Sequence, residues 1–245
     1  MEKVLEVKNI TKIYKNNRGV KDISFDIYPG DIYGFLGPNG AGKTTVMKII
    51  TGLLRASQGE VLLFGHNIVH EFEKAMGRVG CIIETADSYE YMSACQNLKM
   101  AARFYEGLNK NRIDEVLEIV GLSAYKNEKV SQFSLGMKQR LGIAAAILAQ
   151  PDLLILDEPT NGLDIEGMAD IRNLILKLAH ERQVTFFVSS HLAHEMELIC
   201  NRVGILNNGK LIKEGVVAQL LQSHDSLEDF FIQQAKEDRR NNVNE

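Results

Sequence analysis

Residues 37 to 44 read Gly-Pro-Asn-Gly-Ala-Gly-Lys-Thr, a glycine-rich stretch that matches the pattern GxxxxGK[ST]. The apolar run Ile32–Leu36 before it predicts a strand, and residues 43–54 after it predict a helix. Glycines let such a loop turn successive N–H groups toward one point, where the helix N-terminus also favours an anion. The stretch therefore predicts a phosphate-binding loop in an α/β fold. The residues predicted to bind the nucleotide here are Gly37, Pro38, Asn39, Gly40, Ala41, Gly42, Lys43, Thr44 and Thr45.

A second motif ends an apolar strand. Residues 153–157 read Leu-Leu-Ile-Leu-Asp, and Glu158 follows them. In isolation, an ordinary strand with solvated terminal carboxylates explains this pattern equally well. Beside a phosphate loop, Asp157 and the Thr44 hydroxyl are expected to hold a magnesium ion, and Glu158 to accept a proton from the attacking water. The two motifs together predict a nucleoside triphosphatase.

Strand patterns alternate with helical patterns along most of the chain. Further strands are predicted at 60–64, 79–83, 184–189 and 203–207. This alternation predicts a phosphate-loop NTPase core with a mainly parallel sheet and helices on both of its faces. Residues 1–37 predict an antiparallel β hairpin, because Ile23, Phe25 and Ile27 share one face of a strand and polar residues the other. Helical patterns at 93–105, 112–120 and 135–149 predict a helical subdomain inserted at about 85–150.

Composition narrows the classes of protein that the chain can represent. Its 245 residues are 45% hydrophobic and 24% charged, which is enough to bury one sizeable core. The net charge of −4 lacks the basic excess typical of proteins that bind nucleic acid, so no nucleic-acid partner is expected. The longest apolar stretch, residues 143–149, is far shorter than the roughly 20 residues that cross a bilayer. With no apolar leader at its start, the chain is expected in the cytoplasm.

Three cysteines, Cys81, Cys95 and Cys200, form neither a CxxC pair nor a cluster with metal-ligand spacing. They are expected to be small buried hydrophobic residues. The polar end of the chain, residues 235–245, cannot bury a core and is expected to fray after a short C-terminal helix in residues 226–245.

Residues 133–140 read Phe-Ser-Leu-Gly-Met-Lys-Gln-Arg and resemble the signature motif of ATP-binding cassette proteins, usually LSGGQ. Ser134 and Gly136 fall on the serine and the second glycine of that motif, while Leu135 replaces a glycine and Met137 the glutamine. Residues 161–164, Asn-Gly-Leu-Asp, resemble the loop that couples the two ATP sites of a dimer. The resemblance runs from about residue 5 to about residue 215, so residues 1–225 are expected to form a single ATP-binding domain.

The resemblance implies specific roles for further residues. His191, after Ser189 and Ser190, is similar to the switch histidine that contacts the γ phosphate and the attacking water, so the catalytic pair would be Glu158 and His191. Tyr14 occupies the place of the aromatic residue that stacks on adenine, with a core tyrosine as the alternative. Ser134, Gly136 and Asp164 would complete the nucleotide site across a dimer. The implied cofactors are ATP and Mg²⁺.

One departure from the family pattern is informative. Glu84 stands where the family usually has a glutamine that reaches the magnesium ion, and it exchanges a neutral ligand for an anionic one. Together with the altered signature, this glutamate resembles the exporters of bacitracin resistance and lantibiotic self-protection. Glu84 is therefore a candidate magnesium ligand that transmits the nucleotide state to the permease through residues 85–97, although a tolerated variant explains it as well. Tyr89 and Tyr91 in that segment are candidates for contact with the permease or for packing within the subdomain.

The resemblance implies the ATP-hydrolysing motor of a bacterial exporter. Its partners would be a transmembrane permease on separate chains and a second ATP-binding subunit, and it would sit on the inner face of the cell membrane. The permease, and not the motor, determines the cargo in such machines. The alternatives are an importer subunit, a cassette protein that acts on ribosomes or DNA, and a simple kinase or switch GTPase. The last explains neither the residues 134–136 nor His191.

Overall fold

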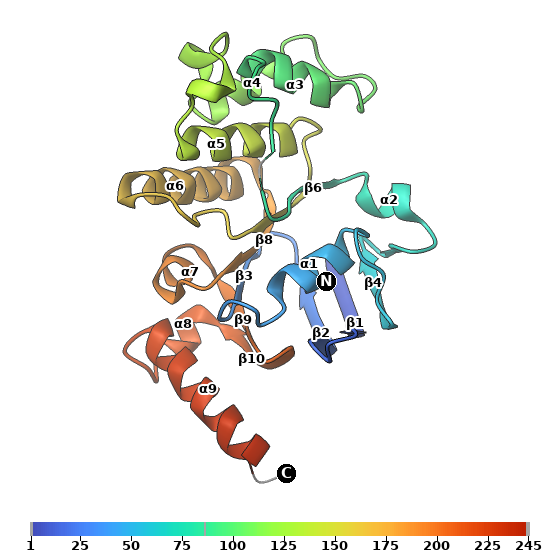
Figure 1. Ribbon diagram of the computed structural model, residues 1–245, viewed down its shortest axis with the longest axis vertical. Coiled ribbons are helices and arrows are strands. Elements are labelled where there is room, and N and C mark those ends of the chain that lie inside the picture. Colours follow the sequence, from blue (N-terminus) through green and yellow to red (C-terminus); the bar gives the residue numbers. More distant parts are fainter. Residues whose placement is uncertain (1, 86, 244–245) are drawn as a thin grey trace.

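The structure is a computed structural model that describes residues 2–85 and 87–243. Within those residues, a central sheet has the strand order β10-β9-β3-β8-β7-β6 (Figure 1). Its neighbouring strands from β9 through β3, β8 and β7 to β6 pair in parallel, and β10 runs antiparallel to β9. The strands span Ile32–Leu36 (β3), Val79–Ile82 (β6), Leu153–Asp157 (β7), Thr185–Ser190 (β8), Arg202–Asn207 (β9) and Lys210–Val216 (β10). The mainly parallel sheet predicted from the alternating pattern is confirmed.

A smaller antiparallel sheet packs beside the central one (Figure 1). Its strand order is β2-β1-β4-β5. Leu5 of β1 pairs with Ile27 of β2 on one side and with Leu63 of β4 on the other. The strands span Leu5–Ile13 (β1), Gly19–Ile27 (β2), Gln58–Leu63 (β4) and His66–Asn67 (β5). The hairpin predicted in residues 1–37 is confirmed as β1 and β2.

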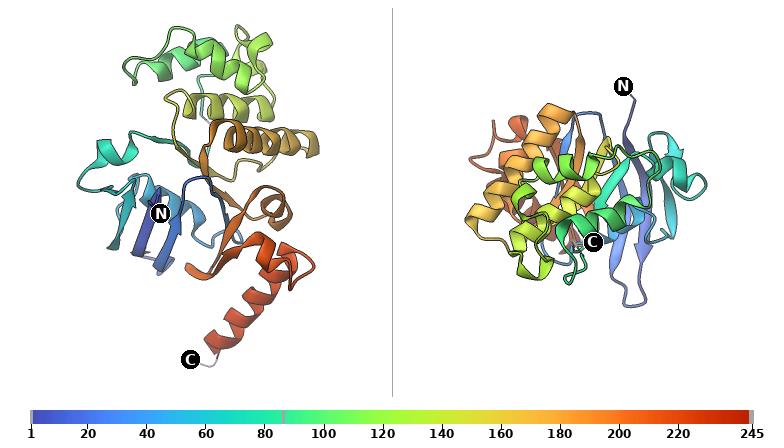
Figure 2. Two further views of the ribbon diagram at one scale, coloured as in Figure 1. Left: turned by 180° about the vertical axis from the view of Figure 1, so that it is seen from behind. Right: turned by 90° about the horizontal axis from the view of Figure 1, so that it is seen from above.

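The helices cover both faces of the central sheet and form a separate lobe at one end. Figure 2 shows this lobe, drawn in green, apart from the antiparallel sheet. The α-helices span Lys43–Ile50 (α1), Phe72–Met76 (α2), Ala94–Ala102 (α3), Arg112–Ile119 (α4), Leu135–Ala146 (α5), Ile165–Arg182 (α6), Ala193–Ile199 (α7), Val217–Leu220 (α8) and Leu227–Val243 (α9). Short 3₁₀ helices cover Ser123–Tyr125 and Val130–Gln132. The predicted helices at 93–105, 112–120 and 135–149 are confirmed as α3, α4 and α5, each ending earlier than the pattern indicated.

Two buried clusters lie on opposite faces of the central sheet. On β3, Ile32 and Leu36 face the cluster that contains the helical lobe, while Tyr33 and Phe35 face the antiparallel sheet. Both faces of the strand are apolar because both are covered, as is usual for parallel strands. Across the second face, the rings of Phe25 and Tyr33 stack at 5.3 Å between centroids and tie the two sheets together.

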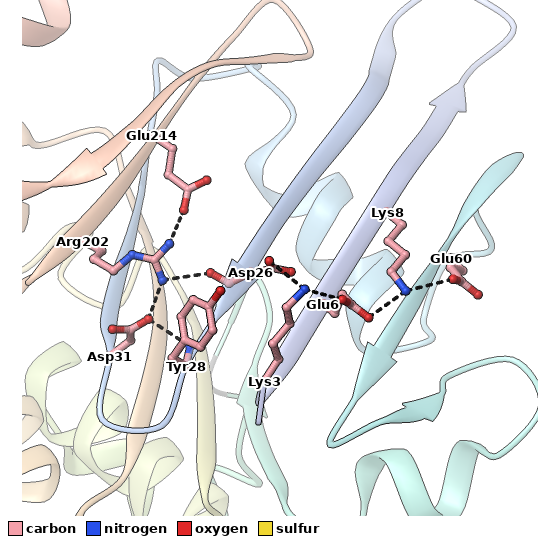
Figure 3. Close-up of polar contacts among 9 residues, drawn as sticks. All are labelled: Lys3, Glu6, Lys8, Asp26, Tyr28, Asp31, Glu60, Arg202 and Glu214. Atoms are coloured by element: carbon pink, nitrogen blue, oxygen red, sulfur yellow. Dashed lines mark hydrogen bonds and ion pairs between the residues drawn. The ribbon is translucent and has the colours of Figure 1, made fainter. Parts of the chain in front are cut away.

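Polar contacts reinforce the junction between the sheets, with Arg202 of β9 at their centre (Figure 3). Its Nη1 donates to Asp31 Oδ2 at 2.7 Å and to the Asp26 carbonyl oxygen at 3.0 Å, and its Nη2 pairs with Glu214 on β10. Asp31 Oδ2 also accepts from Tyr28 N at 3.0 Å. Burial raises the pKa of Glu214, which the charge of Arg202 opposes. This guanidinium therefore holds the end of β2, the β2–β3 turn and β10 in one register.

A second chain of ion pairs crosses the outer surface of the antiparallel sheet (Figure 3). Lys3 pairs with Glu6 and, at 2.9 Å, with Asp26, while Lys8 lies 2.8 Å from Glu6 and 3.4 Å from Glu60. Exposed pairs of this kind add little to stability, so they help the register of the strands more than the stability of the fold.

One expectation fails and another stays a prediction. The C-terminal segment was expected to form a short helix with a frayed tail; α9 spans Leu227–Val243, with bonds such as Gln233 to Glu237 at 3.0 Å, and residues 244 and 245 lie outside the described part. The cysteines were expected to be buried, but only Cys200 is; Cys81 of β6 is exposed and Cys95 is half-buried.

Candidate active site

The polar residues of the site follow the carboxyl ends of neighbouring parallel strands. The phosphate loop follows β3, Glu158 follows β7, His191 follows β8 and Glu84 lies two residues after β6. Because β3, β8, β7 and β6 are consecutive in the sheet, their ends meet at one edge (Figure 1). Ligands of open α/β sheets bind at this edge.

The phosphate loop has the backbone that its glycines predict. Gly40 and Gly42 have φ angles of 80° and 109°, which disfavour a side chain, and Gly42 is the N-cap of α1. The Lys43 side chain is 5% exposed, and its Nζ donates to the carbonyl oxygens of Gly37 at 2.7 Å and Pro38 at 3.2 Å. The lysine thus lies folded over its own loop, with the N-terminus of α1 beside it.

Asp157 is buried and has a hydroxyl on each oxygen. Thr44 Oγ1 donates to Asp157 Oδ2 at 2.8 Å, and Ser189 Oγ donates to Asp157 Oδ1 at 2.5 Å. Ser189 Oγ also accepts from Glu158 N at 2.9 Å, so one hydroxyl orients both acids. In the sequence, Ser189 was noted only as part of the segment before His191. Its position at the end of a strand next to β7 was the signal that could have indicated its role at the site.

Glu158 connects the lysine of the phosphate loop to His191. Its Oε1 lies 3.0 Å from Lys43 Nζ, and its Oε2 lies 2.8 Å from His191 Nδ1. The Glu158 side chain is 18% exposed and its φ is 49°, a left-handed conformation that is uncommon outside glycine. The predicted catalytic pair is thus brought together, and a carboxylate held from both sides can accept a proton from water.

Glu84 does not reach the predicted magnesium ligands. Its Oε1 accepts from Lys48 Nζ of α1 at 2.7 Å, and its side chain is 60% exposed. The backbone at Glu84 has a φ of 69°, and Thr85 N donates to the Ile83 carbonyl oxygen at 3.0 Å, which closes a three-residue γ-turn. Such a turn is strained for a residue with a side chain. Lys48, which the sequence did not single out, is therefore the partner of the Glu84 carboxylate.

The residues implied for the second half of the site begin two other helices. Ser134 is the N-cap of α5 and accepts from Met137 N at 3.2 Å, with Gly136 in the first turn. Asp164 is the N-cap of α6 and accepts from Gly167 N at 2.9 Å. Tyr14, 41% exposed, follows β1 in a turn where its N–H donates to the Arg18 carbonyl oxygen at 2.7 Å. Their exposure leaves the helix start at Ser134 and the Tyr14 ring free for contact with a ligand or a second chain.

The donor set fits a magnesium ion that is held mainly by phosphate and water. The hydroxyl of Thr44 and the carboxylate of Asp157 are hard oxygen ligands, of which Mg²⁺ typically uses one or two. No group of three or more His, Cys, Asp or Glu side chains with metal-binding geometry occurs among residues 2–85 and 87–243. An ion at Thr44 and Asp157 therefore needs the phosphates of a nucleotide to complete its ligands.

A groove of about 730 Å³ separates the edge strand β6 from the helical lobe. Its walls include Cys81 of β6, Met76 of α2, and Phe72, Phe104 and Tyr105, which are 50%, 86% and 40% exposed. The sequence did not predict this groove, because its walls come from segments far apart in the chain. In the part of the chain that the structure describes, no helix is long and apolar enough to cross a membrane.

Comparisons with known proteins identify the family to which the chain is similar. Residues 20–161 match the protein family described as "ABC transporter". The bacitracin transport ATP-binding protein BcrA of Bacillus licheniformis is 45% identical over 87% of this chain and 70% of its own length. The lantibiotic transport ATP-binding protein SrtF of Streptococcus pyogenes is 36% identical over 97% of this chain and its full length. A solved structure titled as a dimeric post-hydrolysis state of the ATP-binding cassette MJ0796 bound to ADP and Pi superposes with a TM-score of 0.77, at 25% identity, over 87% of this chain and 98% of that one.

Proposed function

The chain belongs to the ABC transporter family as an ATP-binding subunit with ATPase activity, and we propose that it is the motor of a bacterial exporter of peptide antibiotics. The contact of Glu158 with both Lys43 and His191, at the edge where the phosphate loop and Asp157 meet, is the observation that carries the ATPase part. Two relatives with transport names, one for bacitracin and one for a lantibiotic, support the class of cargo.

For hydrolysis, we assign separate tasks to the residues of the site. Lys43 leaves Glu158 and turns to the phosphates, where its charge neutralises theirs. Glu158, still held by His191, takes the proton of the attacking water, and His191 orients it. Thr44 and Asp157 are placed to hold Mg²⁺, which would stabilise charge on the transferred phosphoryl group. Tyr14 supplies an exposed ring for the adenine.

A second ATP-binding subunit, in our proposal an identical chain, completes each ATP site. Ser134 and Gly136 offer a hydroxyl and the first N–H groups of α5, which favour an anion. Asp164 lies at the start of α6, close to the exposed residues 161 and 162 of the coupling loop. The dimeric state of the similar cassette MJ0796 supports this arrangement. ATP binding would close the pair and hydrolysis would reopen it, a two-state rigid-body change.

The groove beside β6 is the proposed contact with a transmembrane permease on separate chains. Exposed aromatic side chains such as Phe104 and Phe72 line it, and interfaces are enriched in such residues. The segment 85–97 connects Glu84 to α3 and carries Tyr89 and Tyr91, which are 51% and 68% exposed and whose ring centroids lie 5.8 Å apart. With this contact, the motor would lie peripherally on the inner face of the membrane. In our proposal, it binds no nucleic acid.

Glu84 is the proposed link between nucleotide and permease. To approach Thr44 and Asp157 it must give up Lys48, and that movement would relax the strained turn that begins the segment 85–97. Glu84→Gln tests this role, because an amide keeps the size of the side chain and loses the ion pair. A variant that transports and hydrolyses ATP like the parent would remove the acid from the coupling mechanism.

The proposed function is tested by affinity purification from detergent-solubilised native membranes. The tagged chain carries Glu158→Gln and is supplied with ATP, so that hydrolysis does not release the closed pair. We expect to recover a polytopic membrane protein and a second ATP-binding subunit. Deletion of the gene for that membrane protein should then raise sensitivity to bacitracin or to a lantibiotic.

Other results of these experiments would refute separate parts of the proposed function. Unchanged sensitivity to peptide antibiotics after the deletion would refute the cargo, and accumulation of a nutrient dependent on the same permease would identify an importer. Recovery of ribosomal or DNA-bound proteins without a membrane protein would refute the transport role and leave the ATPase assignment intact.

A further inference from the structure

The tip of the β9–β10 hairpin contacts the back of the phosphate loop. Asn208 and Gly209 form its two-residue turn, with φ angles of 46° and 76°, the signs expected for a type I′ turn. Gly209 N donates to the Ala41 carbonyl oxygen at 3.0 Å, and the Gly209 carbonyl oxygen accepts from Lys21 N at 2.8 Å. The tip is therefore bonded to the phosphate loop on one side and to the start of β2 on the other.

Close packing makes this contact rigid. A Cβ at Gly37 would collide with the Leu206 carbonyl oxygen of β9, and a Cβ at Gly209 would collide with the Gly19 carbonyl oxygen of β2. The phosphate loop thus has no space to shift unless the hairpin shifts with it. Since β2 follows the turn that contains Tyr14, the same hairpin also contacts the strand that comes directly after the proposed adenine contact.

The C-terminal helix α9 holds the hairpin in place. Asn207, 7% exposed at the end of β9, donates from Nδ2 to Asp238 Oδ2 of α9 at 2.7 Å. This is a charge-assisted hydrogen bond in a shielded position. The other end of α9 is fixed by Leu227 and Phe230, which are buried in the core, and Figure 1 shows the helix starting beside α8.

We propose that Asp238 is a positioning residue for nucleotide binding, and that docking of α9 sets the ATP affinity of the subunit. The path runs from Asp238 to Asn207, through the turn at Gly209, to the carbonyl oxygen of Ala41. This inference goes beyond the proposed function, because it assigns control of the phosphate loop to a helix that contributes no residue to the site.

Exchange of donor and acceptor in the full-length protein tests the path. Asp238→Ala removes the acceptor and should raise the Kd for a fluorescent ATP analogue, and the KM for ATP, roughly threefold to tenfold, with kcat changed less than about twofold. Asn207→Asp places a second carboxylate against that of Asp238 and should weaken binding of the ATP analogue at least as much. Combining Asn207→Asp with Asp238→Asn restores one hydrogen bond with its polarity reversed and should return the Kd to within about twofold of the parent.

A control separates this path from general weakening of α9. Gln234→Ala, one turn earlier in the helix, removes the 3.0 Å bond to Glu237 of the same helix and should leave the Kd unchanged. Amide hydrogen exchange of residues 37–44 and 209 should increase in Asp238→Ala and not in Gln234→Ala. The proposal is overturned if Asp238→Ala binds the analogue like the parent, if Gln234→Ala weakens binding equally, or if the double exchange fails to restore it.

Discussion

Replacement of Glu158 by glutamine should separate ATP binding from hydrolysis. Glu158 Oε1 lies 3.0 Å from Lys43 Nζ, so phosphate must compete with the carboxylate for the lysine. The side chains are 18% and 5% exposed, and an ion pair that is only partly shielded contributes on the order of 1 kcal/mol. An amide of the same size keeps the contact with His191 and loses this pair.

The expected result is tighter binding with almost no turnover. Loss of about 1 kcal/mol of competition corresponds to a roughly fivefold lower Kd for ATP. Loss of the general base should reduce kcat by about 10²- to 10⁴-fold. Titration of a fluorescent ATP analogue measures the first quantity, and phosphate release measures the second.

A matched control is Glu166→Gln, which makes the same change of charge on an exposed residue in the first turn of α6. It should leave both quantities near the parental values. Weaker ATP binding by Glu158→Gln would show that the carboxylate does not compete with phosphate for Lys43. A kcat within about tenfold of the parent would remove Glu158 from the role of base.

Three further predictions address the adenine contact, the groove and the packing of the sheet. Tyr14→Ala should weaken ATP binding several-fold, whereas Tyr14→Phe should retain it, because stacking needs the ring and not the hydroxyl; equal losses in both variants would contradict stacking. Desolvation raises the thiol pKa of Cys81, which the groove walls partly shield, and of the buried Cys200. Because Cys81 is still accessible in the groove, a maleimide should label Cys81, faster as the pH rises, and Cys200 only after unfolding. Bound permease should protect Cys81, and unchanged labelling would place the contact elsewhere. Gly204→Ala should lower the free energy of unfolding by about 1–3 kcal/mol in urea titrations, since the added methyl would collide with the buried Tyr33 hydroxyl; an unchanged midpoint would mean that the ring moves freely.

Several features of the fold were predictable because they depend on local patterns. The strands β3 and β7 have the bounds that their apolar runs indicated, since a buried parallel strand needs apolar residues on both faces. The phosphate loop was predictable because the conformation of the loop itself requires its glycines, and Lys43 follows them directly in the sequence. The length of α9 was not predictable, since the polar composition of residues 235–245 does not reveal side-chain bonds within a helix or the contact of Asp238 with a distant strand.

The sequence by itself determined the class of fold and the residue types of the site, because hydrophobic periodicity and loop chemistry act over a few neighbouring residues. Only the tertiary structure decided which partners those residues have. Lys43 pairs with Glu158, Glu84 with Lys48, and Asn207 with Asp238, over separations of many residues along the chain. Such pairs form where the packing of strands and helices brings distant segments together, and that packing is set by the whole chain and not by any one segment.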